Sequence, residues 1–211
     1  METGTKTRGR PRDPAKREAM LDAARTLFLR QGVDAVTVDH VTAAARVSRD
    51  TYYNNFENRD ALLAAVIARE SERIAGDAFL DDDHAEGVRE ALIRYGERFL
   101  RFLADPDAMG WEPMILHLHR HRPDLARSFF DIGPRRAWRA LEQIITAGQR
   151  RGDLSPIDPA QAVNDLIGLW QGSWRVELVY GCRAPLDEGE VQRRARQGVD
   201  VFLGAVGTKG G

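Results

Sequence analysis

Cysteine is nearly absent from this sequence, which contains one, Cys182, among 211 residues. A single cysteine excludes an intrachain disulfide framework and a zinc site made of several cysteine thiolates. Long apolar runs are also missing. None approaches the roughly 18 residues that suggest a membrane-spanning helix, and the N-terminus has no signal-peptide core. We therefore expect a soluble, cytoplasmic protein that has no part in a membrane.

Motifs of enzymes and cofactor sites are missing as well. The sequence has no glycine-rich phosphate loop and no Gly-x-Ser-x-Gly turn, and Cys182 lacks a recognisable catalytic context. We therefore expect no cofactor and treat an enzyme as the less favoured class. The alternation of apolar and polar residues that marks strands is absent too, whereas apolar residues recur at helical spacing, so the sequence predicts an all-α fold.

Charge is unevenly distributed along the chain, although the formal net charge is only -1. Residues 1–60 contain eleven Lys and Arg against nine Asp and Glu, and the remaining residues carry the acidic excess. The run TKTRGRPR within residues 1–12 has four cations and no apolar residue, so we predict a disordered basic arm. Arg8 and Arg10 suit insertion into a narrow minor groove, and a solvated tail without a defined site is the alternative.

The most informative segment extends from Thr37 to Phe56, TVDHVTAAARVSRDTYYNNF, and predicts two short helices joined by a tight turn. Thr37 is a suitable N-cap for the first helix and Ser48 for the second. Tyr52 and Phe56, four residues apart, would face inward. The outward side chains offer cationic, hydroxyl and amide groups for phosphates and base edges, and they are Arg49, Thr51, Tyr53, Asn54 and Asn55.

This region resembles the DNA-binding domain of the tetracycline-repressor (TetR) family. The family motif has a glycine, Thr-Val or Thr-Ile, Ile-Ala, Ala-Gly-Val-Ser, Thr-Leu-Tyr-x-x-Phe, and then a basic residue, an acidic residue and two leucines. The matching residues are Gly32, Thr37, Val41, Ala44, Val47, Ser48, Thr51, Tyr53, Phe56, Arg59, Leu62 and Leu63. By motif position, the resemblance implies that Thr37, Tyr53 and Arg59 hold phosphates, while the major groove is addressed by Arg49, Thr51, Asn54 and Asn55.

Several residues depart from the family pattern. Arg46 stands at a turn position where glycine is common, and a left-handed backbone there costs a non-glycine residue about 1 kcal/mol. Tyr52 replaces an inward leucine, so its hydroxyl needs a partner or the edge of the core. Asn54 and Asn55 replace a common His/Tyr pair. Because Asn can pair bidentately with adenine, we expect an operator sequence particular to this protein.

The resemblance and the apolar periodicity divide the chain into successive parts, with about nine helices in all. For residues 124–151, where Gly133-Pro134 interrupts the pattern, two helices and one bent helix both fit. Residues 158–181 predict a single helix. The parts are a basic arm at 1–12, a three-helix DNA-binding domain at 13–57, a linker helix at 58–76, a ligand-binding and dimerisation domain at 77–205 and a flexible tail at 206–211.

The last two predicted helices carry a broad apolar and aromatic stripe. The resemblance implies that such helices from two subunits form a four-helix bundle, and a two-fold dimer reads half-sites about one helical turn, or a multiple of it, apart. The alternative is that Trp170 and Trp174 only fill the core of one chain. The residues predicted at the dimer interface are Leu166, Trp170, Val191, Ala195, Val199 and Phe202.

By resemblance, the middle helices bind a small-molecule effector. Aromatic and methionine side chains make apolar walls with few polar groups. Since most aromatics at helical spacing are core residues, we expect fewer than roughly half of the candidates to contact a ligand. The candidates are Phe99, Phe102, Trp111, Met114, His117, Trp138, Trp170 and Trp174.

Three histidines lie close together in the same region. His117 and His121 have the i and i+4 spacing of a chelating pair, whereas His119 faces elsewhere. No carboxylate motif completes the set, and the neighbouring arginines Arg120 and Arg122 disfavour a cation. We therefore expect no metal.

The function predicted from the sequence is that of a ligand-responsive, homodimeric transcriptional regulator. It would be a repressor that binds double-stranded DNA at a pseudo-palindromic operator and leaves it when a small-molecule effector binds. Two alternatives stay open: a constitutive DNA-binding protein without an effector, and an enzyme.

Overall fold

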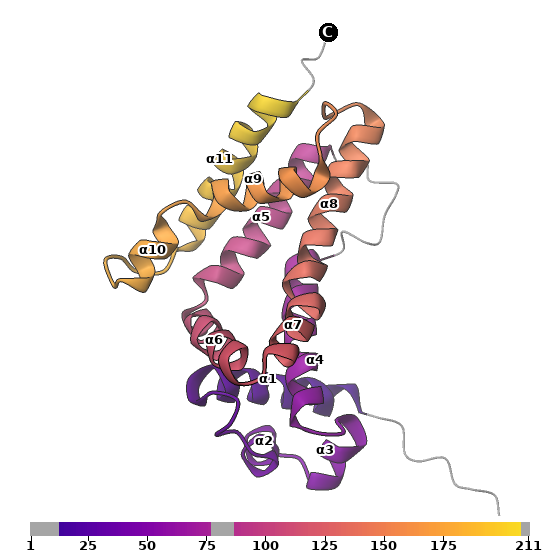
Figure 1. The fold of residues 1–211 in the computed structure, drawn as a ribbon, viewed down its shortest axis with the longest axis vertical. Helices are drawn as coiled ribbons and strands as arrows, with labels where there is room; N and C mark the ends of the chain where they lie inside the picture. The colour runs from indigo at the N-terminus through magenta and orange to yellow at the C-terminus, as the bar shows by residue number, and fades with distance from the viewer. Residues whose placement is uncertain (1–12, 77–86, 208–211) are drawn as a thin grey trace, which may run out of the picture. The chain divides into compact units, whose positions relative to one another are not determined.

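A computed structural model describes residues 13–76 and 87–207, without the side chains of residues 107 and 108. These residues form eleven α-helices, α1 to α11, and one 3-10 helix, η2 (Figure 1). Within the described ranges, the one β-type contact is an isolated antiparallel bridge between Leu154 and Gly207. The predicted all-α class is therefore confirmed. The chain separates into two compact units, residues 1–66 and 67–211, and the division falls inside α4.

The first unit contains α1 (Pro14–Gln31), α2 (Val38–Ala45), α3 (Arg49–Asn55) and the first part of α4 (Arg59–Ala75). Helix α1 packs against both α2 and α3, and α2 contacts α3. Between α2 and α3, Arg46 has a φ of 54° and lies in the left-handed region, as the departure from the glycine pattern predicted. The two short helices and this tight turn form a helix-turn-helix.

Local side-chain bonds fix where these helices begin. The hydroxyl of Thr37 accepts a hydrogen bond from the amide of His40, and the hydroxyl of Ser48 accepts one from the amide of Thr51. Each bond satisfies an amide that has no partner within the first turn of a helix. The predicted caps are thus confirmed. Apolar side chains then close the core of the unit, and they include Met20, Leu21, Phe28, Val41, Tyr52, Phe56, Leu62 and Leu63.

The second unit is a helical bundle in which α5 contacts α8, α9 and α11 (Figure 1). Pro123, Pro134 and Pro159 begin helices, where the missing proline amide costs no intrahelical bond. Besides the end of α4, the unit contains α5 (Val88–Ala104), η2 (Pro106–Gly110), α6 (Trp111–His121), α7 (Pro123–Ile132), α8 (Pro134–Arg151), α9 (Pro159–Gln171), α10 (Trp174–Val179) and α11 (Glu188–Val206).

Two segments, residues 124–151 and residues 158–181, each form two helices. This division explains why the chain has eleven α-helices where about nine were expected. At Gly133 the backbone leaves the helical region, and the structure selects two helices over one bent helix. The prediction of a single helix over 158–181 is wrong. Helix α9 ends at Gln171 because Gly172 adopts a φ of 50°, and α10 begins at Trp174. Glycine adopts this conformation without the steric cost that other residues incur.

Trp170 is the centre of the second unit's core. Its side chain is completely buried, its indole N–H donates to the carbonyl of Ala195, and its ring stacks on Tyr95 at a centroid distance of 5.9 Å. Glycines lie on two sides of the ring. A Cβ added at Gly96 would come within 2.7 Å of the indole, and one added at Gly198 within 2.5 Å. Helices α5 and α11 therefore approach the indole as closely as glycine alone allows.

Candidate functional site

The outward surface of α3 presents three of the predicted DNA-contacting side chains. Arg49, Tyr53 and Asn54 are all exposed, Tyr53 by 58%. Tyr52 is buried as predicted, and its ring meets Tyr53 edge to face at 5.3 Å. Burial raises the pKa of the Tyr52 phenol, which therefore stays protonated. The inward tyrosine supports α3 while the outward residues remain available to a groove.

Arg49 has a partner that sequence reasoning missed. Its Nε donates to one carboxylate oxygen of Asp39 at 2.6 Å, and its Nη2 donates to the other at 2.5 Å. Asp39 belongs to the first turn of α2, so this ion pair joins the two helices of the helix-turn-helix. The Arg49 guanidinium lowers the pKa of the Asp39 carboxyl. Spacing could not reveal the pair, because ten residues and a turn separate its members.

Asn55 and Thr51 are less available than their predicted role requires. Both are partly buried, and the Asn55 side-chain amide donates to the Thr51 carbonyl at 2.8 Å. The Thr51 hydroxyl in turn lies 2.9 Å from that of Ser48. The expectation that Asn55 projects outward is corrected, because its carboxamide turns back onto its own helix. Asn54 is left as the exposed amide of the pair.

Arg59 and Thr37, predicted to hold phosphates, have roles within the protein. The Arg59 guanidinium donates to the carbonyls of Asp34 and Val36, at 3.1 and 3.4 Å, and thereby fixes the loop before α2. Thr37 caps α2, yet its side chain remains exposed. The phosphate contacts of Arg59 and Thr37 stay predictions. Arg8 and Arg10 lie outside the described residues.

The predicted effector residues divide into core and partly exposed groups. Phe99, Met114, Trp170 and Trp174 are buried. Phe102, Trp111 and Trp138 are partly exposed, and the rings of Phe102 and Trp111 lie 6.3 Å apart. Across the described part of the chain, the buried Nε1 of Trp111 finds no hydrogen-bond acceptor. Buried donors of this kind are unusual and point to a missing partner.

The histidines of α6 lie near the surface. His117 and His121 have ring centroids 4.6 Å apart, as their spacing predicts, and both are exposed, as is His119. Among residues 13–76 and 87–207, no three or more His, Cys, Asp or Glu side chains are grouped in a way that could hold a metal ion. His117 also has no place in a buried ligand wall, because its side chain is solvent-exposed.

The prediction of the dimer surface requires correction. All six residues named for it lie buried in the core of the single chain, with exposed fractions of 2% or less: Leu166, Trp170, Val191, Ala195, Val199 and Phe202. The alternative that Trp170 and Trp174 fill the intrachain core is what the structure shows. The apolar stripe pointed to burial correctly, but a stripe does not specify whether the covering helix belongs to the same chain.

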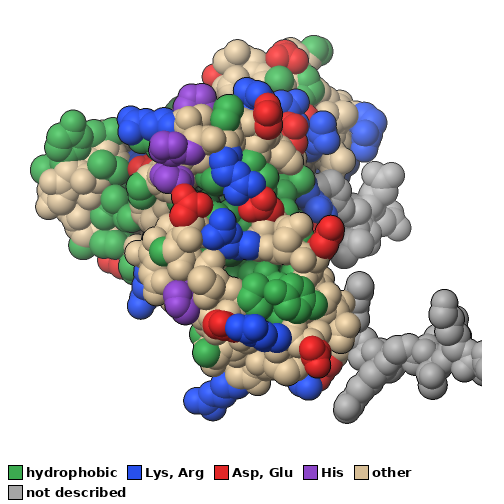
Figure 2. Space-filling model, turned by 60° about the horizontal axis from the view of Figure 1, so that its bottom comes forward, with side chains coloured by type: hydrophobic (Ala, Val, Ile, Leu, Met, Phe, Trp, Pro, Cys, Tyr) green, Lys and Arg blue, Asp and Glu red, His purple; other side chains and the backbone are tan. Residues whose placement is uncertain are grey.

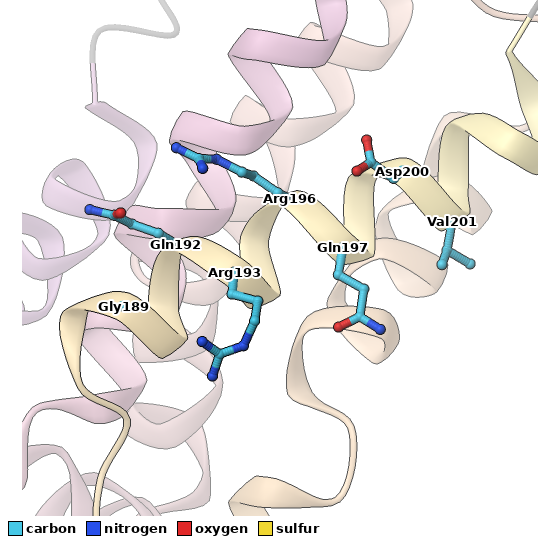
Figure 3. A pocket seen from close by; sticks show the side chains of 7 residues that line it. All are labelled: Gly189, Gln192, Arg193, Arg196, Gln197, Asp200 and Val201. Carbon is cyan, nitrogen blue, oxygen red and sulfur yellow. The ribbon is translucent and has the colours of Figure 1, made fainter.

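The opposite faces of α9 and α11 are exposed. Arg193, Gln197 and Val201 project from the same side of α11 (Figure 3). A groove of about 490 Å³ lies between α9 and the end of α11, and exposed Leu169 and Val201 line it together with Gly168. A Cβ at Gly168 would meet no atom within 4 Å. The chain itself therefore gives no packing reason for this glycine.

A second exposed apolar surface covers α10, which sequence analysis did not single out. Its residues are Val176, Val179 and Tyr180, of which Tyr180 is the most exposed. Figure 2 shows hydrophobic side chains gathered at its left edge, on the side where Figure 1 places α10. Among the described helices, none is both long enough and apolar enough to cross a bilayer.

Comparisons with known proteins agree with the helix-turn-helix. Residues 20–66 match the family described as bacterial regulatory proteins, tetR family, and residues 90–208 match the AefR-like transcriptional repressor, C-terminal domain. The chain is 38% identical over 108 residues to the uncharacterized HTH-type transcriptional regulator YdeS of Bacillus subtilis. That match covers 51% of this chain and 52% of YdeS, about half the length of each.

Longer matches extend the similarity over most of the chain. The HTH-type transcriptional repressor Rv1474c of Mycobacterium tuberculosis is 28% identical over 72% of this chain and 78% of its own length. The solved structure of the flavonoid-responsive regulator FrrA superposes with a TM-score of 0.68 at 28% identity, covering 94% of this chain and 100% of that one. The helix-turn-helix, the helical second unit and these matches together show that the chain belongs to the TetR family of transcriptional regulators.

Proposed function

We propose that the protein is a homodimeric repressor that acts in the cytoplasm, binds a pseudo-palindromic operator through α3, and is released by a small-molecule effector. The observation that carries the proposal is α3 itself, capped by Ser48 and presenting Arg49, Tyr53 and Asn54 to solvent. A short capped helix with outward cationic, phenolic and amide groups suits a major groove. Rv1474c is described as a repressor, which supports repression over activation.

Dimerisation is proposed through the outward faces of α9 and α11. Leu169 and Val201, exposed by 37% and 53%, would become buried, and Gly168 would let a partner helix approach closely. We expect Val201→Arg to convert the dimer into a monomer in sedimentation at micromolar concentration. Val176→Arg on α10 is the matched control and should leave the dimer intact. A Val201→Arg variant that stays dimeric, or a wild-type monomer, would contradict this surface.

Effector binding is proposed beside Phe102 and Trp111. The Trp111 indole N–H lacks an acceptor among the described residues, so an aromatic or apolar molecule carrying an oxygen acceptor would satisfy it. FrrA is described as flavonoid-responsive, and flavonoids have this chemistry. Thermal-shift measurements with a flavonoid panel should reveal stabilising molecules, and Trp111→Phe should weaken their effect. If operator binding persists and no small molecule stabilises the protein, the constitutive alternative is favoured.

The end of α4 offers a route between effector and DNA-binding helices. Arg98 of α5 donates through Nε to the Ile74 carbonyl at 2.9 Å and through Nη2 to the Ala75 carbonyl at 3.0 Å. These bonds attach the C-terminus of α4 to α5, which leads directly to η2 and α6. A ligand that moves α5 would therefore move the end of α4. A coupling of about 1–3 kcal/mol would weaken operator binding roughly 5- to 150-fold.

The decisive experiment is selection of duplexes from a random-sequence DNA library by the full-length protein. We expect a two-fold symmetric consensus. Asn54→Ala should relax base choice at one position of each half-site, because an amide that pairs with a base edge is lost. Tyr53→Phe should weaken all sequences similarly, because only a phosphate contact is lost. Equal effects from both variants, or no consensus for the wild type, would contradict the assignment.

A further inference from the structure

The Asp39–Arg49 pair occupies a position where a stabilising role alone does not explain it. Both side chains are exposed, Asp39 by 60% and Arg49 by 67%, and solvent screening limits what an exposed ion pair, even a bidentate one, contributes to stability. Arg49 is also the first residue of α3, where the positive end of the helix macrodipole disfavours a cation. An arginine at this position is therefore better explained by a contact with a binding partner than by its contribution to the fold.

The geometry of the pair decides which Arg49 donors remain. Asp39 engages the side-on edge of the guanidinium, made of Nε and one N–H of Nη2. The end-on edge, made of Nη1 and the second N–H of Nη2, is not used by Asp39. Two parallel N–H groups at this edge match the O6 and N7 acceptors that guanine displays in the major groove. An arginine can thus accept support on one edge and contact a base with the other.

We propose that Asp39 is a specificity-determining residue, which holds Arg49 so that its end-on edge selects guanine in each operator half-site. The inference rests on the proposed function, in which α3 enters the major groove. Two physical effects favour it. The bidentate bond fixes the plane of a side chain that otherwise has many rotamers, so less freedom is lost on binding. The carboxylate also offsets the guanidinium charge, which reduces the competing attraction of Arg49 to sequence-independent phosphates.

Removal of the Asp39 carboxylate should have opposite effects on base discrimination and on binding to unrelated DNA. If Arg49 only neutralised a phosphate, removal of the Asp39 carboxylate would make the protein bind all DNA sequences more tightly. If Asp39 instead holds Arg49 against a base, removal of its carboxylate lowers discrimination at one base pair, while binding to unrelated DNA stays equal or becomes tighter. This separation between specific and non-specific affinity distinguishes support of Arg49 from simple electrostatics.

The test compares full-length wild type, Asp39→Asn and the matched control Asp50→Asn. Asp50 is an exposed carboxylate in the first turn of α3, so its variant removes the same charge without removing the partner of Arg49. Fluorescence anisotropy would measure binding to the selected operator, to its single base-pair variants and to an unrelated duplex. We expect wild type and Asp50→Asn to prefer guanine at one half-site position by roughly 10- to 100-fold. Asp39→Asn should retain less than about a 3-fold preference there.

The outcomes separate the inference from the function on which it rests. A consensus whose guanine preference survives in Asp39→Asn would overturn the inference and leave the repressor proposal intact. So would an equal loss of affinity for every duplex accompanied by a lower melting temperature, since Asp39 would then only stabilise the helix pair. A wild-type protein that selects no sequence would overturn both. Arg49→Ala should lose the same preference as Asp39→Asn, and the double variant should lose no more.

Discussion

The surface formed by α2 and α3 differs from the core around Trp170 in how far its side chains are occupied within the protein. Around Trp170, glycine is required at positions 96 and 198 by the space that the indole occupies, and the indole N–H donates to the Ala195 carbonyl of the same chain. On α3, the side chains of Asn54 and Tyr53 are exposed, although the Tyr53 ring also packs edge to face on Tyr52. The core around Trp170 shows how the second unit holds its shape, whereas the exposed side chains of α3 are those that we propose contact DNA. Substitutions should therefore affect stability in one region and DNA choice in the other.

Trp170→Ala should have the largest effect. It removes a fully buried indole and leaves a cavity between α5, α9 and α11, so we expect the free energy of unfolding to fall by about 3–5 kcal/mol. Urea denaturation followed by circular dichroism would measure it. Asn54→Ala is the control from the other region and should change stability by less than about 0.5 kcal/mol while altering operator choice. Comparable losses in both variants would break the contrast between the regions.

Gly198→Ala should have the next largest effect. The added methyl would lie 2.5 Å from the Trp170 ring, so helix α11 or the indole must shift, and we expect a loss of about 1–3 kcal/mol of unfolding free energy. Gly204→Ala on the same helix provides the comparison, because its added methyl meets nothing within 4 Å. That variant should differ from wild type by no more than about 1 kcal/mol, in the direction of better helix propensity. Equal melting temperatures for both variants would argue against tight packing of Gly198 on the Trp170 ring.

Arg46→Gly should act in the opposite direction. Relief of the left-handed strain at this turn should raise the free energy of unfolding by about 0.5–1 kcal/mol. Arg46→Ala removes the same charge but keeps the Cβ, so it should give no such gain. If both variants are equally stable, charge and not backbone strain determines the effect. Chemical denaturation at neutral pH is the suitable measurement.

Glu188→Gln should give the smallest effect and one that depends on pH. Hydrogen bonds from Arg101 lower the pKa of the Glu188 carboxyl from 4.5 to about 2, so the folded state favours the ionised form. A lowered folded-state pKa stabilises the protein above pH 4.5, and this contribution is lost as the pH falls towards 2. Wild type should therefore exceed Glu188→Gln in urea midpoint at pH 7, and the difference should shrink on acidification. A pH-independent difference would exclude this ion pair as its cause.

The sequence predicted well wherever neighbours along the chain decide the structure. Caps at Thr37 and Ser48, the inward placement of Tyr52 and the left-handed Arg46 all follow from interactions within a few residues. Two local features were nevertheless missed, because in each the sequence is compatible with more than one outcome. The outward direction assigned to Asn55 failed because a bond to the preceding turn of the same helix competes with exposure. The break at Gly172 was missed because a glycine inside an apolar stripe is compatible with a continuing helix.

By itself, the sequence determined the all-α class, the helix-turn-helix and the family, since apolar periodicity, caps and motif spacing are local properties of the chain. Only the tertiary structure decided that helices of the same chain cover the apolar faces of α9 and α11, where glycine must admit Trp170, and which carboxylate holds Arg49. A pattern of apolar residues specifies that a face is buried and not what buries it. That choice depends on which helices pack together, and only the folded chain brings Asp39 to Arg49.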